Sequence, residues 1–165
     1  MTNYRRQYRR GGTYFFTLTL AERRADWLVR HIDLLRTSIR SEKLAHPFRL
    51  AAWVVLPGHM HVLMRLPEGD GDFSNRLRRI KAGFSRALPI LNQASASQLS
   101  KGERGIWQRR FWEHVIRDEH DWQRHFDYIH LQPGQARARQ PSKRLAAFIV
   151  QSPCRARNLS AGLGR

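Results

Sequence analysis

The stretch LPGHMHVLMRLPEG, residues 56–69, constrains the fold more than any other part of the chain. Its Pro57-Gly58 pair is typical of a tight turn, and it separates the apolar run FRLAAWVVLP (48–57) from a second extended run. Two such runs joined by so short a turn predict an antiparallel hairpin. Side chains alternate along a strand, so His59 and His61 share one face of the second strand, roughly 6–7 Å apart.

This histidine pair has two interpretations. Two imidazoles at that separation can converge on one metal ion. The same pattern also fits two polar residues on the wetter face of a half-buried sheet, with no ligand role. The intervening Met60 and the following Val62 and Met64 point to the other face, which we expect to be the buried one.

The rest of the chain alternates between strand and helix patterns. Near-alternation predicts a strand over 13–20, and apolar residues at helical spacing predict an amphipathic helix over 22–43. Further patterns predict a helix over 73–88 capped by Asp72 or Ser74, a flexible loop over 92–105, a strand over 106–118, and a helix from Asp118 to Gln132 ended by Pro133-Gly134. The order strand–helix–strand–strand–helix–strand predicts a ferredoxin-like split βαβ, an α+β fold with a four-stranded antiparallel sheet, helices on one face and a further helix after the last strand.

Length and hydropathy predict one globular domain. A chain of 165 residues with 41% hydrophobic residues can bury a sizeable core. It contains no apolar run of about 18 residues that would span a membrane, and its N-terminus lacks the apolar region of a signal peptide. The lone Cys154 excludes an intramolecular disulfide. We therefore expect a cytoplasmic protein.

Charge is the strongest signal in the composition. Thirty Lys and Arg against thirteen Asp and Glu give a formal net charge of +17. Such an excess concentrates polyanions, and nucleic acid is the partner it favours over an acidic protein or a membrane surface. Four basic residues of the 73–88 helix lie off its apolar stripe and form either a phosphate-tracking surface or a solvated helix face: Arg76, Arg79, Lys81 and Arg86.

The last predicted helix carries a tyrosine away from its apolar stripe. The stripe consists of Trp122, Phe126 and Ile129, whereas Tyr128 lies about 200° from Phe126 at 100° per residue. One turn before and one turn after Tyr128, Arg124 and Gln132 lie on its side of the helix. Taken alone, the pattern also fits a partly exposed surface tyrosine.

Together, these stretches resemble a known family. A histidine–hydrophobe–histidine strand followed by a helix with Tyr-Ile-His resembles the HUH single-tyrosine transposases, and more narrowly the bacterial REP-associated tyrosine transposases. The similarity covers residues 3 to about 133 and is carried by NYRR, GGTYFFT, AWVVLPGHMHVLMRLPEGDGDFSNR, IKAGFSR and GERGIWQRRFWEHVIRDEHD through DYIH. An ordered set of this kind is far more specific than a lone His-x-His pair.

The resemblance implies an enzyme that cleaves and joins single-stranded DNA at palindromic hairpins. It makes Tyr128 the nucleophile, forming a 5′-phosphotyrosine link, and His59, His61 and Gln132 the ligands of Mg²⁺ or Mn²⁺. The family usually has Asn where this chain has Gln132. The resemblance to the related insertion-sequence transposases implies that Gln can take this place. A tyrosine hydroxyl is mostly protonated at neutral pH, and both His130 and a metal-bound water are candidates to take its proton.

The resemblance also predicts how DNA is recognised. The basic arm, residues 1–12, supplies candidate contacts through stacking tyrosines and arginines that read bases or phosphates, unless it adds only non-specific affinity. With the helix residues named above, the candidate DNA contacts are Tyr4, Arg5, Arg6, Arg9, Arg10 and Arg124. We expect a monomer associated with the nucleoid and its repetitive extragenic palindromes.

The similarity ends after Gly134, which divides the chain into a catalytic domain, 1–134, and a diverged basic tail, 135–165. We expect KRLAAFIV (143–150) still to pack on the domain. Besides an active transposase, two alternatives stay open, the second weaker than the first. The chain could be a cleavage-inactive relative that still binds hairpin DNA, or an RNA-binding ferredoxin-like protein in which His59 and His61 are incidental.

Overall fold

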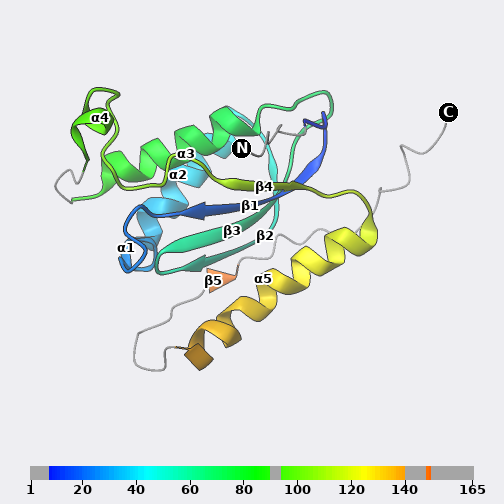
Figure 1. Ribbon diagram of the computed structural model, residues 1–165. Coiled ribbons are helices and arrows are strands. Elements are labelled where there is room, and N and C mark those ends of the chain that lie inside the picture. Colours follow the sequence, from blue (N-terminus) through cyan, green and yellow to red (C-terminus); the bar gives the residue numbers. More distant parts are fainter. Residues whose placement is uncertain (1–7, 90–93, 140–147, 150–165) are drawn as a thin grey trace, which may run out of the picture.

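The structure, a computed structural model, describes residues 8–89, 94–139 and 148–149, and from residue 132 onward it describes the course of the backbone alone. Strands and helices are interspersed along the chain, as Figure 1 shows. The elements are β1 (Thr13–Thr19), α1 (Trp27–Arg30), α2 (Ile32–Ala45), β2 (Arg49–Leu56), β3 (His59–Arg65), α3 (Phe73–Ala87), α4 (Ala96–Leu99), β4 (Trp112–Val115), α5 (Glu119–Arg139) and β5 (Phe148–Ile149).

The strands form one antiparallel sheet in the order β4-β1-β3-β2-β5. Strands β2 and β3 are joined by the tight turn at Pro57-Gly58, so the predicted hairpin is confirmed. The first four strands in this order form the sheet of the predicted ferredoxin-like α+β fold, which is confirmed. The expected packing of 143–150 on the domain is confirmed for its two described residues: Phe148 and Ile149 pair with Val55 and Val54 and extend the sheet. That they do so as a fifth strand was not predicted.

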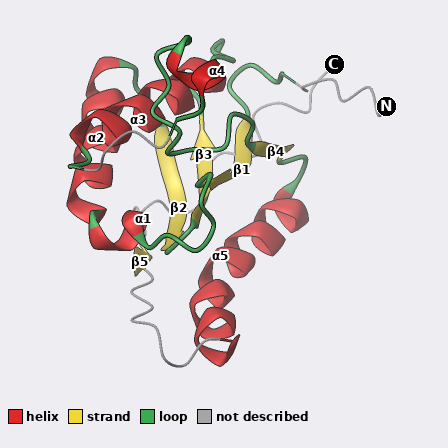
Figure 2. Cartoon of the chain, turned by 60° about the vertical axis from the view of Figure 1, so that its left-hand side comes forward, coloured by secondary structure: helices red, strands yellow, loops and turns green. Residues whose placement is uncertain are grey.

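Side-chain alternation gives the sheet two apolar faces. The larger core contains Phe16, Val62 and Met64, and α2 and α3 cover it with their apolar stripes. On the opposite face a smaller cluster includes Phe15, Leu63 and Ile129, and α5 packs there. Figures 1 and 2 show α2 and α3 on one side of the sheet and α5 on the other. The helix that follows the last core strand therefore lies over the face that carries His59 and His61.

Three element boundaries differ from the prediction. The helix expected over 22–43 is two helices, α1 and α2, with a break at His31. The loop expected over 92–105 contains the short helix α4, which begins with a capping box between Ser95 and Gln98. The strand expected over 106–118 is confined to β4, although Trp107 forms an isolated bridge with Leu20.

The end of α5 was also predicted wrongly. The helix passes through Pro133-Gly134 and ends at Arg139. A proline removes one backbone donor and crowds the preceding turn, but its fixed φ stays helical, so a helix can continue past it with local distortion. At its other end Asp118 accepts a hydrogen bond from the Asp121 backbone N–H at 2.8 Å, as expected for a helix cap. None of the helices in the described ranges is long and apolar enough to cross a bilayer.

Candidate active site

His59 and His61 lie on the face of β3 that α5 partly covers. His61 is buried, with 4% of its surface exposed, whereas His59 is partly exposed. Their ring centroids are 5.1 Å apart. The His61 ring stacks on Phe15 with a centroid distance of 5.3 Å, and it meets the ring of Tyr128 at 5.2 Å in an edge-on contact. The structure thus brings together the histidine pair and the tyrosine singled out in the sequence.

The two ring nitrogens of His61 differ in their surroundings. Nδ1 lies 2.9 Å from the Thr17 hydroxyl oxygen, and Thr17 is the cross-strand partner of His61 in β1. Nε2 is buried and has no hydrogen-bond partner in the part of the chain that the structure describes. A buried polar atom without a partner is costly. If Nδ1 carries the proton and donates it to Thr17, the Nε2 lone pair is free to bind a cation, which is the usual arrangement of a ligating histidine.

Burial keeps both histidines neutral at physiological pH. Burial, together with a smaller effect of the neighbouring His59, lowers the pKa of His61 to about 3. The pKa of His59 is also lowered, first by burial and then by the charge of Arg23. A metal ion binds the neutral imidazole, so protons do not compete for these nitrogens at neutral pH.

Tyr128 lies at the edge of this site because the opposite side of its helix, α5, packs against the sheet. Ile129 is fully buried in the smaller core, and Trp122 and Phe126 pack against the same core. Tyr128 keeps 42% of its surface exposed, as expected for a residue off the apolar stripe, and its ring rests edge-on against Phe15 at 5.9 Å. The exposed side of the Tyr128 ring is therefore accessible to a large substrate.

The other predicted members of the site lie along the same helix. Gln132 is in α5, one turn after Tyr128, but its side chain is outside the described residues, so its ligand role stays a prediction. Arg124, one turn before Tyr128, is exposed. His130 directs its Nδ1 to the Phe126 carbonyl oxygen at 2.7 Å, and two residues of helix turn it about 200° away from Tyr128.

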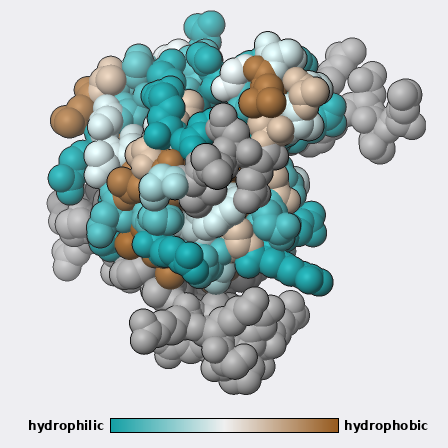
Figure 3. Space-filling view, turned by 90° about the vertical axis from the view of Figure 1, so that its left-hand side faces the viewer, coloured by the Kyte–Doolittle hydropathy of each residue, from teal (hydrophilic) through white to brown (hydrophobic). Residues whose placement is uncertain are grey.

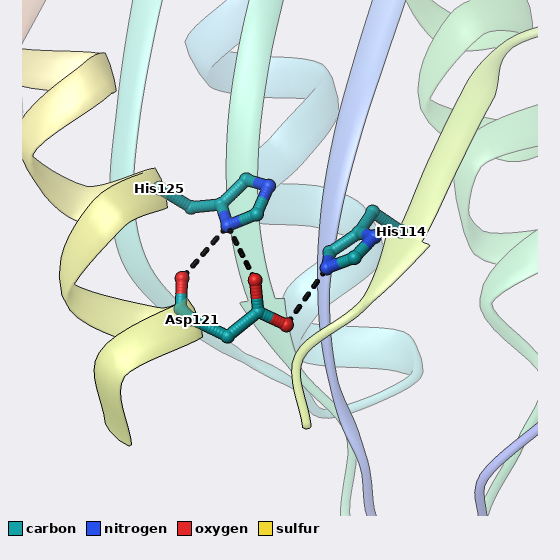
Figure 4. A group of neighbouring side chains, drawn as sticks. All are labelled: His114, Asp121 and His125. Atoms are coloured by element: carbon teal, nitrogen blue, oxygen red, sulfur yellow. Dashed lines mark hydrogen bonds and ion pairs between the residues drawn. The ribbon is translucent and has the colours of Figure 1, made fainter. Parts of the chain in front are cut away.

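A second polar cluster, which the sequence analysis missed, joins β4 to α5 (Figure 4). It consists of His114, Asp121 and His125, whose candidate ligand atoms all lie within 4.8 Å of one another. The Asp121 carboxylate is 2.8 Å from His114 Nε2 and accepts a hydrogen bond from the Arg117 backbone N–H at 3.1 Å. His125 Nδ1 lies 2.7 Å from the Asp121 carbonyl oxygen, and its ring is stacked on His114 at 4.6 Å.

This cluster could hold a metal ion, but its contacts are those of a hydrogen-bonded network. Two imidazoles and a carboxylate are ligand types that divalent metals accept. Burial alone would raise the pKa of Asp121, yet the hydrogen bonds from His114 and Arg117 outweigh it and bring that pKa to about 2. The carboxylate is therefore ionised and already bonded. Phe15 separates the cluster from the histidine pair, since it contacts both His125, at 4.8 Å, and His61.

Arg76, a predicted phosphate contact, has a structural place in the fold. It is buried, with 5% of its surface exposed. Its guanidinium donates to the Asp70 carboxylate at 2.6 Å and to three backbone carbonyl oxygens, those of Asp72, His46 and Pro47. These bonds fasten α3 to the segment before β2, so we leave Arg76 out of the proposed DNA surface.

The other predicted phosphate contacts of α3 divide into two groups, one bonded within the fold and one exposed. Arg79 is partly buried and paired with the Glu42 carboxylate at 3.0 Å. Lys81 donates to the Gln108 carbonyl oxygen at 2.7 Å, and burial lowers its pKa to about 8. Arg86 is exposed at the rim of a cavity of about 550 Å³ between α3 and the segment before β4. Since α3 covers the larger core, this cavity is separate from the tyrosine site.

The described part of the basic arm is anchored next to β1. Tyr8 stacks on Phe73 at 5.2 Å, and the Arg9 backbone N–H donates to the Tyr14 hydroxyl at 2.6 Å. Arg9 and Arg10 are exposed. The predicted contacts Tyr4, Arg5 and Arg6 lie outside the described residues. The face seen in Figure 3 is mainly hydrophilic, with apolar residues in small separate patches, as expected for a chain with a net charge of +17.

The fold and the arrangement of these residues define a class of protein, the HUH single-tyrosine transposases. The REP-associated tyrosine transposase of Escherichia coli K12 is 46% identical over 133 residues, covering 81% of this chain and 73% of the relative. A Haemophilus influenzae protein, provisionally given the same name, is 42% identical over 134 residues. The alignment covers 81% of this chain and 76% of the relative. The chain belongs to the REP-associated tyrosine transposase family.

Solved structures agree with this assignment. A REP-associated tyrosine transposase solved in complex with a REP hairpin aligns with a TM-score of 0.70 at 44% identity, covering 82% of this chain and 74% of that one. A Deinococcus radiodurans protein provisionally named a transposase has a TM-score of 0.51 at 18% identity, covering 79% and 98%, and shows the shared fold alone. No model of a known protein family matches the chain.

Proposed function

We propose that this transposase cuts and rejoins single-stranded DNA at palindromic hairpins, with Tyr128 as the nucleophile and a divalent metal ion held by the histidine pair. The observation that carries the proposal is the pairing of an exposed tyrosine with a buried imidazole whose Nε2 has no hydrogen-bond partner among the described residues. Family membership supports a transposase-type enzyme.

We propose that the ion is Mg²⁺ or Mn²⁺, held by residues of β3 and α5. His59 and His61 would supply neutral nitrogens, and Gln132 would supply an amide oxygen from α5. When bound, the ion draws charge from the non-bridging phosphate oxygens and so favours attack at phosphorus. Thr17 contributes by fixing the orientation of the His61 ring through its 2.9 Å contact with Nδ1.

The reaction we propose at Tyr128 is a phosphoryl transfer. The hydroxyl oxygen attacks phosphorus, the bond between phosphorus and the 3′ oxygen breaks, and the phosphate stays on the 5′ side as a phosphotyrosine. The hydroxyl gives up its proton and the leaving oxygen gains one, producing a free 3′-hydroxyl. Attack by a 3′-hydroxyl on the phosphotyrosine reverses the step and joins strands.

Hairpin DNA is the partner we propose. The solved relative is bound to a REP hairpin, and the net charge of +17 suits a polyanion. Arg86, Arg124 and the arm residues Arg9 and Arg10 are the exposed cations we assign to it. We further propose that the protein acts as a monomer at the nucleoid, and that residues 1–134 carry the chemistry while 135–165 form a tail.

A nicking assay tests this function. Labelled single-stranded DNA that folds into REP hairpins is incubated with protein and Mg²⁺ or Mn²⁺, and covalent protein–DNA adducts are separated on a denaturing gel. We expect an adduct with the wild-type chain that disappears with Tyr128→Phe and with EDTA. Tyr8→Phe is the matched control, because Tyr8 is also exposed and its stacking on Phe73 survives the loss of a hydroxyl.

Two other outcomes would favour the remaining alternatives. Tight hairpin binding without an adduct under either metal would indicate a cleavage-inactive relative. Tighter binding of ribose than of deoxyribose hairpins would favour RNA, because only RNA offers the 2′-hydroxyl. An adduct that persists in Tyr128→Phe would exclude this tyrosine as the nucleophile.

A further inference from the structure

Trp112 is a large exposed aromatic residue beside the tyrosine site. It lies at the start of the edge strand β4, and 50% of its surface is exposed. Its ring is fixed from two sides, by Phe15 at 5.8 Å in an edge-on contact and by His114 at 5.9 Å with an interplanar angle of 6°. An indole that is held in one orientation and is half exposed to solvent can stack with another planar group.

The sheet register places Trp112 in line with His61. Thr17 of β1 is paired with Trp112 on one side and with His61 on the other, so the three side chains lie in one row on the same face. Neighbouring strands are about 4.8 Å apart, which puts the Cα atoms of Trp112 and His61 roughly 10 Å apart. Phe15 links the two residues, since its ring meets those of Trp112 and Tyr128 in edge-on contacts at 5.8 and 5.9 Å.

The charge around this row suits a nucleic acid strand. Arg110, two residues before Trp112, is exposed, and so is Arg124 on α5. Isolated aromatic surface surrounded by cations is the combination that binds single strands, because the cations follow the phosphates while bases stack on the rings. An apolar protein partner would be a poorer match for this basic surface.

We propose that Trp112 is the stacking platform for the nucleobase that flanks the phosphate attacked by Tyr128. The proposal rests on the function proposed above and names a contact for the single-stranded part of the substrate. Every base has a flat π face, so this contact selects unpaired DNA rather than a particular sequence. It would hold the strand across the row Trp112–Thr17–His61 while the hairpin stem is bound elsewhere.

Fluorescence of a base analogue tests the platform. The Tyr128→Phe chain, which keeps the DNA intact, is titrated with REP hairpins carrying single-stranded flanks in which 2-aminopurine replaces each flank base in turn. We expect quenching at a flank position, lost in the additional variant Trp112→Ala and partly kept in Trp112→Phe. Trp112→Ala should also weaken binding of the flanked hairpin about ten-fold while leaving binding of a hairpin without flanks unchanged.

Controls separate this proposal from its alternatives. Leu99→Ala, which removes a similarly exposed apolar side chain from α4, should change neither signal. Unchanged quenching in Trp112→Ala, or equal weakening for both hairpins, would overturn the platform. A third result would also overturn the platform: the wild-type chain is a dimer, and Trp112→Ala makes it a monomer without altering DNA binding. Trp112 would then belong to a dimer interface.

The two proposals fail in different ways. If the wild-type chain forms no adduct but quenching depends on Trp112, the chemistry proposed for Tyr128 is wrong and the platform stands. If the wild-type chain forms the adduct and quenching does not depend on Trp112, the chemistry stands and the platform is wrong.

Discussion

At the scale of single residues, the orientation of His61 depends on Thr17. The threonine hydroxyl is the partner of His61 Nδ1. If it accepts the Nδ1 proton, the lone pair of Nε2 is left for the proposed metal ion. Thr17→Val keeps the shape of the side chain and removes this partner. We expect Mn²⁺ affinity, measured by isothermal titration calorimetry, to fall about ten-fold or more, the usual effect of losing a residue that orients a ligand.

Thr13→Val is the matched control for this substitution. Thr13 is on the same strand and the same face, but its cross-strand partner is Arg65 rather than a histidine. Its replacement should leave Mn²⁺ affinity unchanged. Equal affinity for Mn²⁺ in the wild-type and Thr17→Val chains would mean that His61 does not bind the ion through the arrangement described above.

Local periodicity was sufficient to find some residues of this site but not others. The alternation of a strand put His59 and His61 on one face, and helical spacing put Tyr128 off the apolar stripe. Thr17, Phe15 and Trp112 belong to the same site through the pairing of β1 with β3 and β4. That register links distant segments, and no period within one segment specifies it.

At the scale of elements, the cluster of His114, Asp121 and His125 attaches the start of α5 to β4. The Asp121 carboxylate is buried and its folded-state pKa, about 2, lies below its ordinary value of 3.8. A depressed pKa means that the carboxylate stabilises the fold fully above pH 3.8, and that this stabilisation is lost as the pH falls toward 2. Its full size is about 2 kcal/mol by linkage.

We therefore expect Asp121→Asn to reduce the free energy of unfolding at pH 7 and to flatten its dependence on pH between 4 and 2. Urea unfolding at a series of pH values measures both effects. Asp127→Asn is the control, because Asp127 is exposed on the same helix and should leave the profile unchanged. Parallel profiles for Asp121→Asn and the wild-type chain would show that the cluster does not attach α5.

Helix α3 allows a second prediction that separates stability from DNA binding. Arg76→Leu leaves the Asp70 carboxylate and three carbonyl oxygens without their partner, so we expect a loss of about 3 kcal/mol in the free energy of unfolding. Arg86→Ala removes an exposed cation and should barely change stability. It should instead weaken hairpin binding and lower the slope of log affinity against log salt by about 0.7–0.9.

Thermal unfolding and salt-dependent fluorescence anisotropy measure these two effects in parallel. If Arg76→Leu unfolds like the wild-type chain but loses DNA binding, the original assignment of Arg76 to a phosphate-tracking surface would be restored. The sequence pattern alone could not separate Arg76 from Arg86, because both lie off the apolar stripe. Only the packing of α3 against the segment before β2 distinguishes them.

At the scale of the whole molecule, the predicted order of elements identified the fold because it depends on the apolar pattern of each segment. The way α5 completes the molecule was not predictable to the same degree. Its length past Pro133, and the pairing of Phe148–Ile149 with β2, depend on contacts between distant segments. The histidine face of the sheet meets Tyr128 because α5 packs over part of that face and leaves the tyrosine exposed.

The net charge of +17 is a property of the whole molecule. Substitutions in the basic arm test whether its cations contact DNA directly or act only through the overall charge. The end of the arm is fixed in place, since the Gly11 N–H donates to the Asp70 carbonyl oxygen at 2.8 Å and Arg9 is bonded to Tyr14. We expect Arg9 and Arg10 to contact phosphates. Replacing both with Ala should lower the salt slope by roughly 1.5 and weaken matched and scrambled hairpins alike.

Anisotropy titrations of both hairpins over a range of salt concentrations measure these quantities. Arg36→Ala with Arg40→Ala is a suitable control, because it removes the same charge from α2, a helix that carries none of the residues we assign to DNA. If the arm variant loses its preference for the matched hairpin, Arg9 and Arg10 read bases, because phosphate contacts carry no sequence information. If both double variants behave alike, the arm has no contact of its own and acts only through the field of the whole molecule.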